Sequence, residues 1–254
     1  MNGPNSDIDA LLVAPRHIKR KEHFFELLAP LLRNHPDVSE ITEAREAYVP
    51  IIKMKFQGVD IDMLFARIQQ KEVGRDLDLL DNNILMNCDE DTIRSLNGCR
   101  VTDMILKLVP VQFKENFELT LRCIKLWAKN RGVYGNVFGY FGGVSWAMLV
   151  AKICMLNPRM APNRLLETFF VYFRDYSWGS QNPVTLCDIA NDPKVVKFGI
   201  PDSLLYEPNN KEKMPIITPA FPSMNSSFNV SESTKNIILT ELEKGALITA
   251  SILE

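Results

Sequence analysis

Apolar and polar positions change their period along the first third of the chain. Runs that alternate between apolar and polar residues predict strands, whereas apolar residues three and four apart predict a helix. Pro30 lies within the helical pattern and is expected to kink or end that helix early. Gln57-Gly58 predicts a tight turn between the last two runs. The predicted elements are a strand over residues 7–13, a helix over 24–32, and strands over 49–56 and 59–65.

After about residue 70 the apolar spacing becomes helical. Residues 142–156 are apolar almost all round, which predicts a buried helix. The stretch 157–227 is rich in Pro, Asn and Ser and predicts an irregular connection with short helices. Two further helices are predicted before these segments, over residues 91–108 and 117–130.

A last helix is predicted near the C-terminal end of the sequence. Ser231 or Ser233 can cap it, because a serine side chain accepts a hydrogen bond from a free backbone N–H of the first turn. Ile238, Leu242 and Ile252 then share one face of this helix.

Composition adds the size and class of the fold. The 254 residues are 46% hydrophobic, which excludes a disordered chain and can fill the core of one large domain or two ordinary ones. The order of the predicted elements divides the chain into an α/β unit over residues 1–72 and a larger helical unit over 73–254.

The net charge and the spacing of possible metal ligands exclude some classes of function. Lys and Arg number 29 against 31 Asp and Glu, a net charge of −2, so a bulk basic surface for nucleic acid is absent. Any contact with RNA or DNA must then use a local basic strip. No histidine pairs with a cysteine at zinc-ligand spacing, and no apolar run approaches membrane-spanning length.

Three aspartates on two predicted strands are the strongest candidate site. Asp7 and Asp9 share one face of a strand, and Asp62 is embedded in an apolar run of a second strand. If the strands are neighbours, the carboxylates converge, and like charges about 4 Å apart repel by about 4 kcal/mol at an effective dielectric constant of about 20. Divalent cations remove that repulsion, and two Mg²⁺ ions can activate an attacking hydroxyl and stabilise a leaving phosphate oxygen.

Two alternatives stay open for these carboxylates. One alternative is that an aspartate pair on an edge strand is simply part of a solvated surface. A third aspartate within an apolar run favours a site instead, because buried charges need partners. Asp60 has the same parity as Asp62 and competes for the metal role. Asp62 is preferred, because Asp60 lies beside the turn and can be solvated.

Seven peptides of the sequence carry a family resemblance. They are SDIDALLVAPRH (6–17), AYVPIIK (47–53), IDMLFAR (61–67), RSLNGCRV (94–101), IKLWAK (124–129), GGVSWAM (142–148) and MPIITPA (214–220). In this order and spacing they resemble the nuclear-type eukaryotic poly(A) polymerases, which belong to the DNA polymerase β-like nucleotidyltransferase superfamily.

The resemblance implies a palm-like mixed sheet with helices, followed by a mainly helical central domain. It implies the template-independent transfer of AMP from ATP to an RNA 3′-hydroxyl, with release of pyrophosphate. Asp7, Asp9 and Asp62 match the family's catalytic, metal-binding aspartates, so two Mg²⁺ (or Mn²⁺) ions are the implied cofactors. It also implies mRNA 3′-end polyadenylation in the nucleus, with cleavage and polyadenylation factors as partners and no membrane association.

The resemblance assigns nucleotide and RNA contacts as well. Lys125 shares a basic helical face with Arg122 and Lys129, which by itself fits a solvated face as well as a phosphate site. The resemblance makes Lys125 a ligand of the ATP triphosphate. The other ATP contacts that it implies are Asn97, Tyr134, Asn136, Gly143, Val144 and Thr218, and it places Lys53 and Asn229 near the RNA 3′ end.

The sequence departs from the family pattern at both ends. Family members carry a Gly-Ser motif upstream of the aspartate pair, whereas the six residues before Asp7 contain none. We therefore expect a sheet that is incomplete at its N-terminus and a chain without the family's C-terminal RNA-binding domain. Two alternative functions stay open: an inactive, truncated paralogue that binds RNA or processing factors as a scaffold, and a nucleotidyltransferase with a different nucleotide or acceptor.

Overall fold

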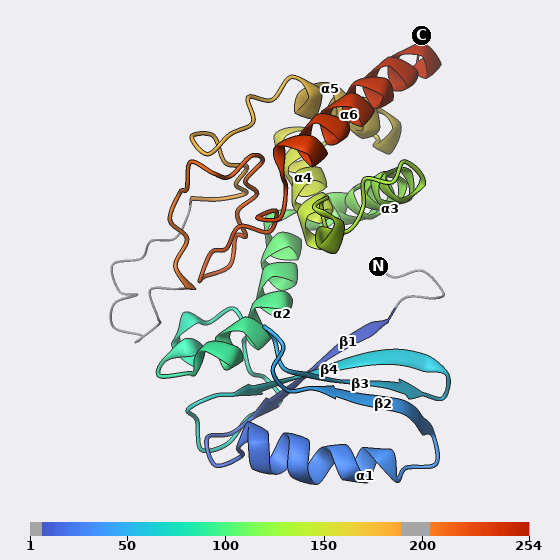
Figure 1. The fold of residues 1–254 in the computed structure, drawn as a ribbon. Helices are drawn as coiled ribbons and strands as arrows, with labels where there is room; N and C mark the ends of the chain where they lie inside the picture. Colours follow the sequence, from blue (N-terminus) through green and yellow to red (C-terminus); the bar gives the residue numbers. More distant parts are fainter. Residues whose placement is uncertain (1–6, 189–203, 254) are drawn as a thin grey trace. The chain divides into compact units, whose positions relative to one another are not determined.

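The chain forms two compact units, which the computed structural model describes over residues 7–188 and 204–253 (Figure 1). The first unit comprises residues 1–100 and 191–204, and the second comprises 101–190 and 205–254. A mixed β-sheet with helices makes up the first unit and helices make up the second, so the predicted fold class is confirmed. Among the described residues, no helix is both long and apolar enough to cross a membrane.

A four-stranded mixed sheet dominates the first unit. The outer strand β1 pairs with β4 in parallel, and β4, β3 and β2 then pair antiparallel. Gln57 and Gly58 join β3 to β4 with φ angles of 49° and 81°, the left-handed backbone that suits a two-residue hairpin turn. Three of the strands and the turn confirm the prediction. The strands span Ile8–Ala14 (β1), Val38–Ala44 (β2), Ile51–Phe56 (β3) and Val59–Arg67 (β4).

Strand β2 is the strand that the sequence analysis missed. It lies at the edge of the sheet, its pairing with β3 shifts register between Ser39 and Thr42, and Glu40 has a φ of 53°. Its larger apolar residues, Val38 and Ile41, are three apart. The strand therefore lacks the two-residue period on which strand prediction depends.

One helix lies along a face of the sheet, and it passes through Pro30 rather than ending there (Figure 1). It consists of η1, a π-helix over Arg20–Leu28, and α1 over Ala29–Arg33. The Ala29 N–H donates to the Phe24 carbonyl, five residues back, and Pro30, which has no N–H to donate, follows directly after these wide turns. The predicted helix is confirmed, and its wide turns accommodate the proline.

The core of the first unit lies between this helix and the sheet. Phe24 and Phe65 stack with ring centroids 5.2 Å apart. Successive side chains of a strand point to opposite faces of the sheet, so the residues next to these core residues in each strand face away from the helix. The buried core residues are Ala14, Phe24, Phe25, Ala29, Ile52 and Phe65.

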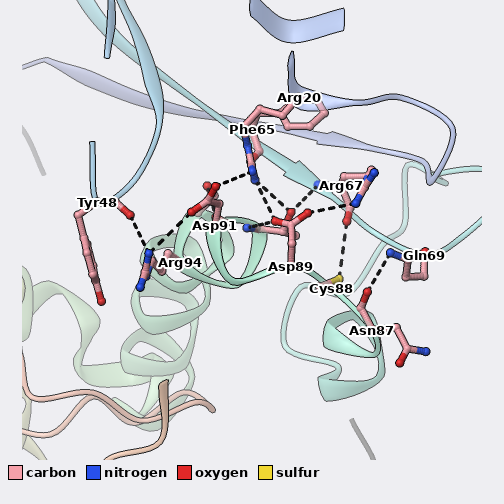
Figure 2. A network of polar contacts seen from close by, with 12 residues as sticks. Arg20, Tyr48, Phe65, Arg67, Gln69, Asn87, Cys88, Asp89, Asp91 and Arg94 are labelled. Atoms are coloured by element: carbon pink, nitrogen blue, oxygen red, sulfur yellow. Dashed lines mark hydrogen bonds and ion pairs between the residues drawn. The ribbon is translucent and has the colours of Figure 1, made fainter. Parts of the chain in front are cut away.

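A network of charged side chains holds the start of α2 (Glu90–Leu108) in the first unit (Figure 2). Asp89 precedes the helix and accepts a hydrogen bond from the Thr92 N–H at 2.8 Å, which caps the helix. The Asp89 carboxylate also accepts from Arg20 of η1 at 3.3 Å and from Arg67 of β4 at 3.2 Å. Arg20 donates to Asp91 of α2 at 2.9 Å as well. The network therefore joins a strand and two helices.

The second unit is built around the buried helix α4. Trp146 of α4 is fully buried and makes edge-on contacts with Trp127 and Phe141. The apolar helix that the sequence predicts here is confirmed. The helices are α3 (Lys114–Asn130), α4 (Gly143–Leu156), α5 (Pro162–Arg174) and α6 (Glu232–Leu253), with the short turns η3 (Val111–Phe113) and η4 (Asn136–Phe138).

Helix α5 corrects the prediction of short helices within an irregular stretch. Leu165, Phe169 and Phe173 recur every four residues and are buried, and Pro162 occupies the first helical position. The local apolar spacing therefore outweighs the Pro- and Asn-rich composition of the longer stretch.

Helix α6 begins with a reciprocal pair of hydrogen bonds. The Ser231 hydroxyl accepts from the Thr234 N–H at 3.2 Å, and the Thr234 hydroxyl accepts from the Ser231 N–H at 3.0 Å. Ser231 is thus the cap of the two serines that the sequence allowed. Ile238 and Leu242 are buried as one face, whereas Ile252 is 73% exposed.

Candidate active site

Carboxylates gather on the face of the sheet that points away from the helix. Asp9 of β1 lies directly opposite Asp62 of β4, and Asp62 lies opposite Lys53 of β3. Residues opposite each other in neighbouring strands share a face, and the adjacent Ile52 faces the core on the other side. Asp7 directly precedes β1, two residues before Asp9. The predicted convergence of the carboxylates depends on neighbouring strands, and the pairing of β1 with β4 provides this.

Negative charge is crowded at this face. Burial raises the pKa of Asp9, and the carboxylates of Asp7 and Asp62 raise it further, while Lys53 opposes them. Lys53 Nζ lies 2.6 Å from Asp62 Oδ2, and this hydrogen bond raises the pKa of Lys53. Ionisation of Asp9 is thus less favourable than that of a free aspartate, and further positive charge would favour it.

The chemistry of these side chains fits a divalent cation. Carboxylate oxygens are the donors that Mg²⁺ prefers, and the crowding that raises the pKa of Asp9 is relieved by a cation. Over residues 7–188 and 204–253, no three His, Cys, Asp or Glu side chains are grouped closely enough to hold a metal ion. At this face the Asp62 carboxylate is instead paired with Lys53. A pocket of about 340 Å³ at this face is lined by Asp7, Glu40, Lys53, Met54, Asp60 and Asp62.

Asp60 and Asp62 differ in their surroundings although they share a face. Asp60 is exposed near the turn and lies opposite Lys55. The Asp62 side chain is only 17% exposed and lies between Asp9 and Lys53 in the ladder. The two aspartates can therefore be compared directly by mutation.

Three predicted nucleotide ligands meet in the second unit. A Cβ atom added to Gly143, at the start of α4, would lie 2.9 Å from the Tyr134 hydroxyl and 3.5 Å from Lys125 Nζ. Burial lowers the pKa of Lys125, and the nearby Lys129 lowers it further. Lys129 Nζ itself lies 5.2 Å from the centroid of the Tyr134 ring. A hydroxyl and an ammonium group therefore both lie close to the backbone at Gly143, and together they are groups that can bind an anion.

Asn136 lies beside the same helix start. A Cβ atom on Gly142 would be 3.6 Å from the Asn136 Cβ, and the Asn229 side chain donates to the Asn136 carbonyl at 3.1 Å. The side-chain Oδ1 of Asn136 is buried and has no hydrogen-bond partner in the part of the chain that the structure describes. Buried acceptors are normally satisfied, so this atom points to a missing donor. Val144, in the first turn of α4, is 40% exposed.

Asn97 and Thr218 occupy other parts of the chain. Asn97 is partly buried on α2, in the portion that belongs to the first unit. Thr218 is buried in the second unit, where its hydroxyl accepts from the Met224 N–H at 2.8 Å. Their contacts with ribose and base remain predictions.

The sequence analysis did not identify the pairing of Lys53 with Asp62, although a signal for it exists. A two-residue turn at Gln57-Gly58 places Phe56 opposite Val59, and counting outward from there places Lys53 opposite Asp62. The network around Asp89 was also missed.

Family models and relatives identify the lineage of the chain. A model of the poly(A) polymerase nucleotidyltransferase domain matches residues 1–109, and a model of the poly(A) polymerase central domain matches residues 116–254. The chain belongs to the poly(A) polymerase family.

Curated poly(A) polymerases from three organisms are 46% identical to the chain. The match extends over 255 residues of a poly(A) polymerase of Dictyostelium discoideum, 252 of nuclear poly(A) polymerase 4 of Arabidopsis thaliana, and 250 of poly(A) polymerase PAPalpha of Candida albicans. These matches cover 98% to 99% of this chain but 30%, 33% and 44% of the three relatives. The chain thus spans less than half the length of these poly(A) polymerases.

Solved structures of other RNA-extending enzymes share the fold of this family member. A crystal structure of the Cid1 poly(U) polymerase matches with a TM-score of 0.59 and 15% identity, covering 95% of this chain and 75% of that one. Terminal uridylyl transferase 4 of Trypanosoma brucei with bound GTP matches with a TM-score of 0.57 and 14% identity, covering 98% and 81%. At this identity the likeness concerns the fold alone.

Proposed function

We propose that this chain carries out template-independent transfer of AMP from ATP to the 3′-hydroxyl of RNA, with release of pyrophosphate. The observation that carries the proposal is the pairing of Asp9 with Asp62 on neighbouring strands, at a face where Asp7 adds a third carboxylate. The 46% identity to poly(A) polymerases supports adenylyl transfer as the reaction.

Asp7, Asp9 and Asp62 are the proposed metal-binding residues. Two Mg²⁺ or Mn²⁺ ions bound there would activate the RNA hydroxyl and stabilise the leaving pyrophosphate. Asp9, whose pKa is raised by burial and by its acidic neighbours, gains a counter-charge in this way. Asp62 is preferred to Asp60, because Asp62 lies opposite Asp9 and is the less exposed of the two.

Lys125 and Tyr134 are the proposed triphosphate ligands in the second unit. The Lys125 ammonium would attract phosphate oxygens, and the Tyr134 hydroxyl would donate a hydrogen bond to them. Both groups lie close to Gly143 at the start of α4, which supports an anionic group beside them.

Base recognition is assigned to the neighbouring residues. The unpartnered Oδ1 of Asn136 would accept a hydrogen bond from the adenine amino group, and the exposed Val144 would pack on the base. Asn97 is proposed to contact the ribose and Thr218 the base side. Lys53 and Asn229 are proposed to contact the RNA 3′ end.

The cellular process is proposed from the relatives. The Arabidopsis relatives are named nuclear poly(A) polymerases, and on that basis we assign the chain to polyadenylation of mRNA 3′ ends in the nucleus. RNA ends, ATP, and cleavage and polyadenylation factors are the proposed partners.

The test is incorporation of each of the four nucleotides into an oligo(A) primer, with and without a chelator. ATP should be preferred about tenfold or more over CTP, GTP and UTP, and the chelator should abolish incorporation. Equal use of all four nucleotides would favour a nucleotidyltransferase of different specificity. Absence of both incorporation and ATP binding would favour the scaffold.

A matched pair of glycine variants tests the nucleotide site separately. Gly143→Ala places a methyl group between the Tyr134 hydroxyl and Lys125, so it should weaken ATP binding about tenfold. Gly179→Ala adds a methyl group in the same unit where no atom lies within 4 Å, so ATP binding should not change. Equal affinities of both variants would contradict the assigned site.

A further inference from the structure

We propose that Lys53 is an internal cation that competes with the divalent metal for Asp62, and so positions that carboxylate. The inference rests on the proposed function, because it takes Asp62 to be a metal ligand. It adds a step: metal binding displaces the Lys53 ammonium from the Asp62 carboxylate.

The geometry of the β3–β4 hairpin favours this ion pair. Lys53 and Asp62 are cross-strand partners, so backbone pairing holds them opposite each other, and Nζ lies 2.6 Å from Oδ2. A metal ion that binds Asp62 through Oδ2 requires the oxygen that Lys53 now engages, and a metal ion on the other oxygen would lie close to the ammonium group and be repelled by it. The two cations therefore compete for this carboxylate.

The surrounding charges explain why the lysine is held there. The carboxylates of Asp62, Asp7 and Asp9 all favour the charged form of Lys53, so the lysine offsets part of the negative charge at this face. A divalent cation brings more positive charge to the same place. Once the divalent cation binds, Lys53 is no longer needed to offset the negative charge of the carboxylates.

The Lys53 side chain is exposed enough to move away from Asp62. Its side chain is 52% exposed, whereas the Asp62 side chain is 17% exposed. A released ammonium on a flexible four-carbon stem can reach toward a phosphate of the RNA 3′ end, the contact proposed for Lys53. Lys53 would then pair first with the Asp62 carboxylate and afterwards with a phosphate of the RNA.

Lys55 offers an internal control. It lies two residues further along β3, on the same face, and its Nζ is 2.7 Å from Glu40 Oε2. Its cross-strand partner is Asp60. Removing Lys55 therefore takes one positive charge from the neighbourhood without breaking the bond to Asp62.

The experiment measures Mn²⁺ binding to the 254-residue chain by calorimetry or by the spin resonance signal of free Mn²⁺. Lys53→Met should bind Mn²⁺ about tenfold more tightly than the unmodified chain, because the competing cation is gone. Lys55→Met should change the affinity by about twofold or less, since the Lys55 ammonium is paired with Glu40 and makes no bond to Asp62. Lys53→Arg, which keeps a cation opposite Asp62, should bind like the unmodified chain.

Different failures identify different errors. Equal affinities of Lys53→Met and Lys55→Met, or tightening in Lys53→Arg as large as in Lys53→Met, would overturn the competition. Asp62→Asn serves as the reference for the metal site and should weaken Mn²⁺ binding strongly. If Asp62→Asn binds Mn²⁺ as the unmodified chain does, the metal assignment of the proposed function fails. Thermal unfolding of each variant confirms that it is folded.

Discussion

The first unit contains two clusters of charge with opposite character. Around Asp89, two arginines and a helix N-terminus surround the carboxylate, and although burial raises its pKa, the hydrogen bonds of Thr92 and Arg20 outweigh this and lower it. At the sheet face, Asp9 lies near two further carboxylates, and its pKa is raised. The comparison separates carboxylates that are paired with positive charge from carboxylates that crowd one another, to which the proposed function assigns a cation.

Loss of the Asp89 carboxylate should have the largest effect on stability. Asp89→Ala removes the cap of α2 and one partner each from Arg20 and Arg67, so the free energy of unfolding should fall by about 2 kcal/mol. Urea unfolding measures the change. Asp91→Ala, which removes a bond to Arg20 but no cap, should be milder. If the two variants are equally stable, the cap is not the main contribution of Asp89.

Loss of the Asp9 charge should act in the opposite direction. Asp9→Asn removes a carboxylate that is crowded by Asp7 and Asp62, so the midpoint of thermal unfolding should rise by about 2 °C in the presence of a chelator. The same variant should lose activity. A lower midpoint would show that Asp9 is satisfied by its surroundings and would remove the contrast between the two clusters.

The pH dependence of the two effects should be the smallest and most specific difference. Because the Asp89 pKa is lowered, its stabilisation is complete above the ordinary value of 3.8 and is lost as the pH falls through the folded-state pKa. Because the Asp9 pKa is raised, its penalty is absent below 3.8 and develops as the pH rises through the folded-state pKa. Unfolding of Asp89→Asn and Asp9→Asn across acidic pH, each against the unmodified chain, should show differences of opposite sign. A shared sign would contradict the account.

More of the candidate site could be predicted from the sequence than of the contacts and elements that hold it in place. The spacing of Asp7 and Asp9, and the hairpin that carries Asp62, follow from local patterns, and the structure places Asp9 opposite Asp62. The partners of Asp89 could not be predicted, because Arg20 is 69 residues away in the sequence and no periodic pattern links them. Strand β2 was missed because its bulged edge lacks the two-residue period, and α5 proved longer than the short helices predicted there because its local apolar spacing outweighs the composition of the stretch.

The central claim is that the sheet face carries the catalytic metal site. The most direct measurement compares AMP incorporation into oligo(A) by Asp62→Asn and Asp60→Asn under identical conditions. The two variants remove the same charge from the same pocket, but only Asp62 lies opposite Asp9. We predict that Asp62→Asn loses activity by about a thousandfold or more, whereas Asp60→Asn keeps it within about threefold. Full activity in Asp62→Asn, or equal losses in both variants, would contradict the account.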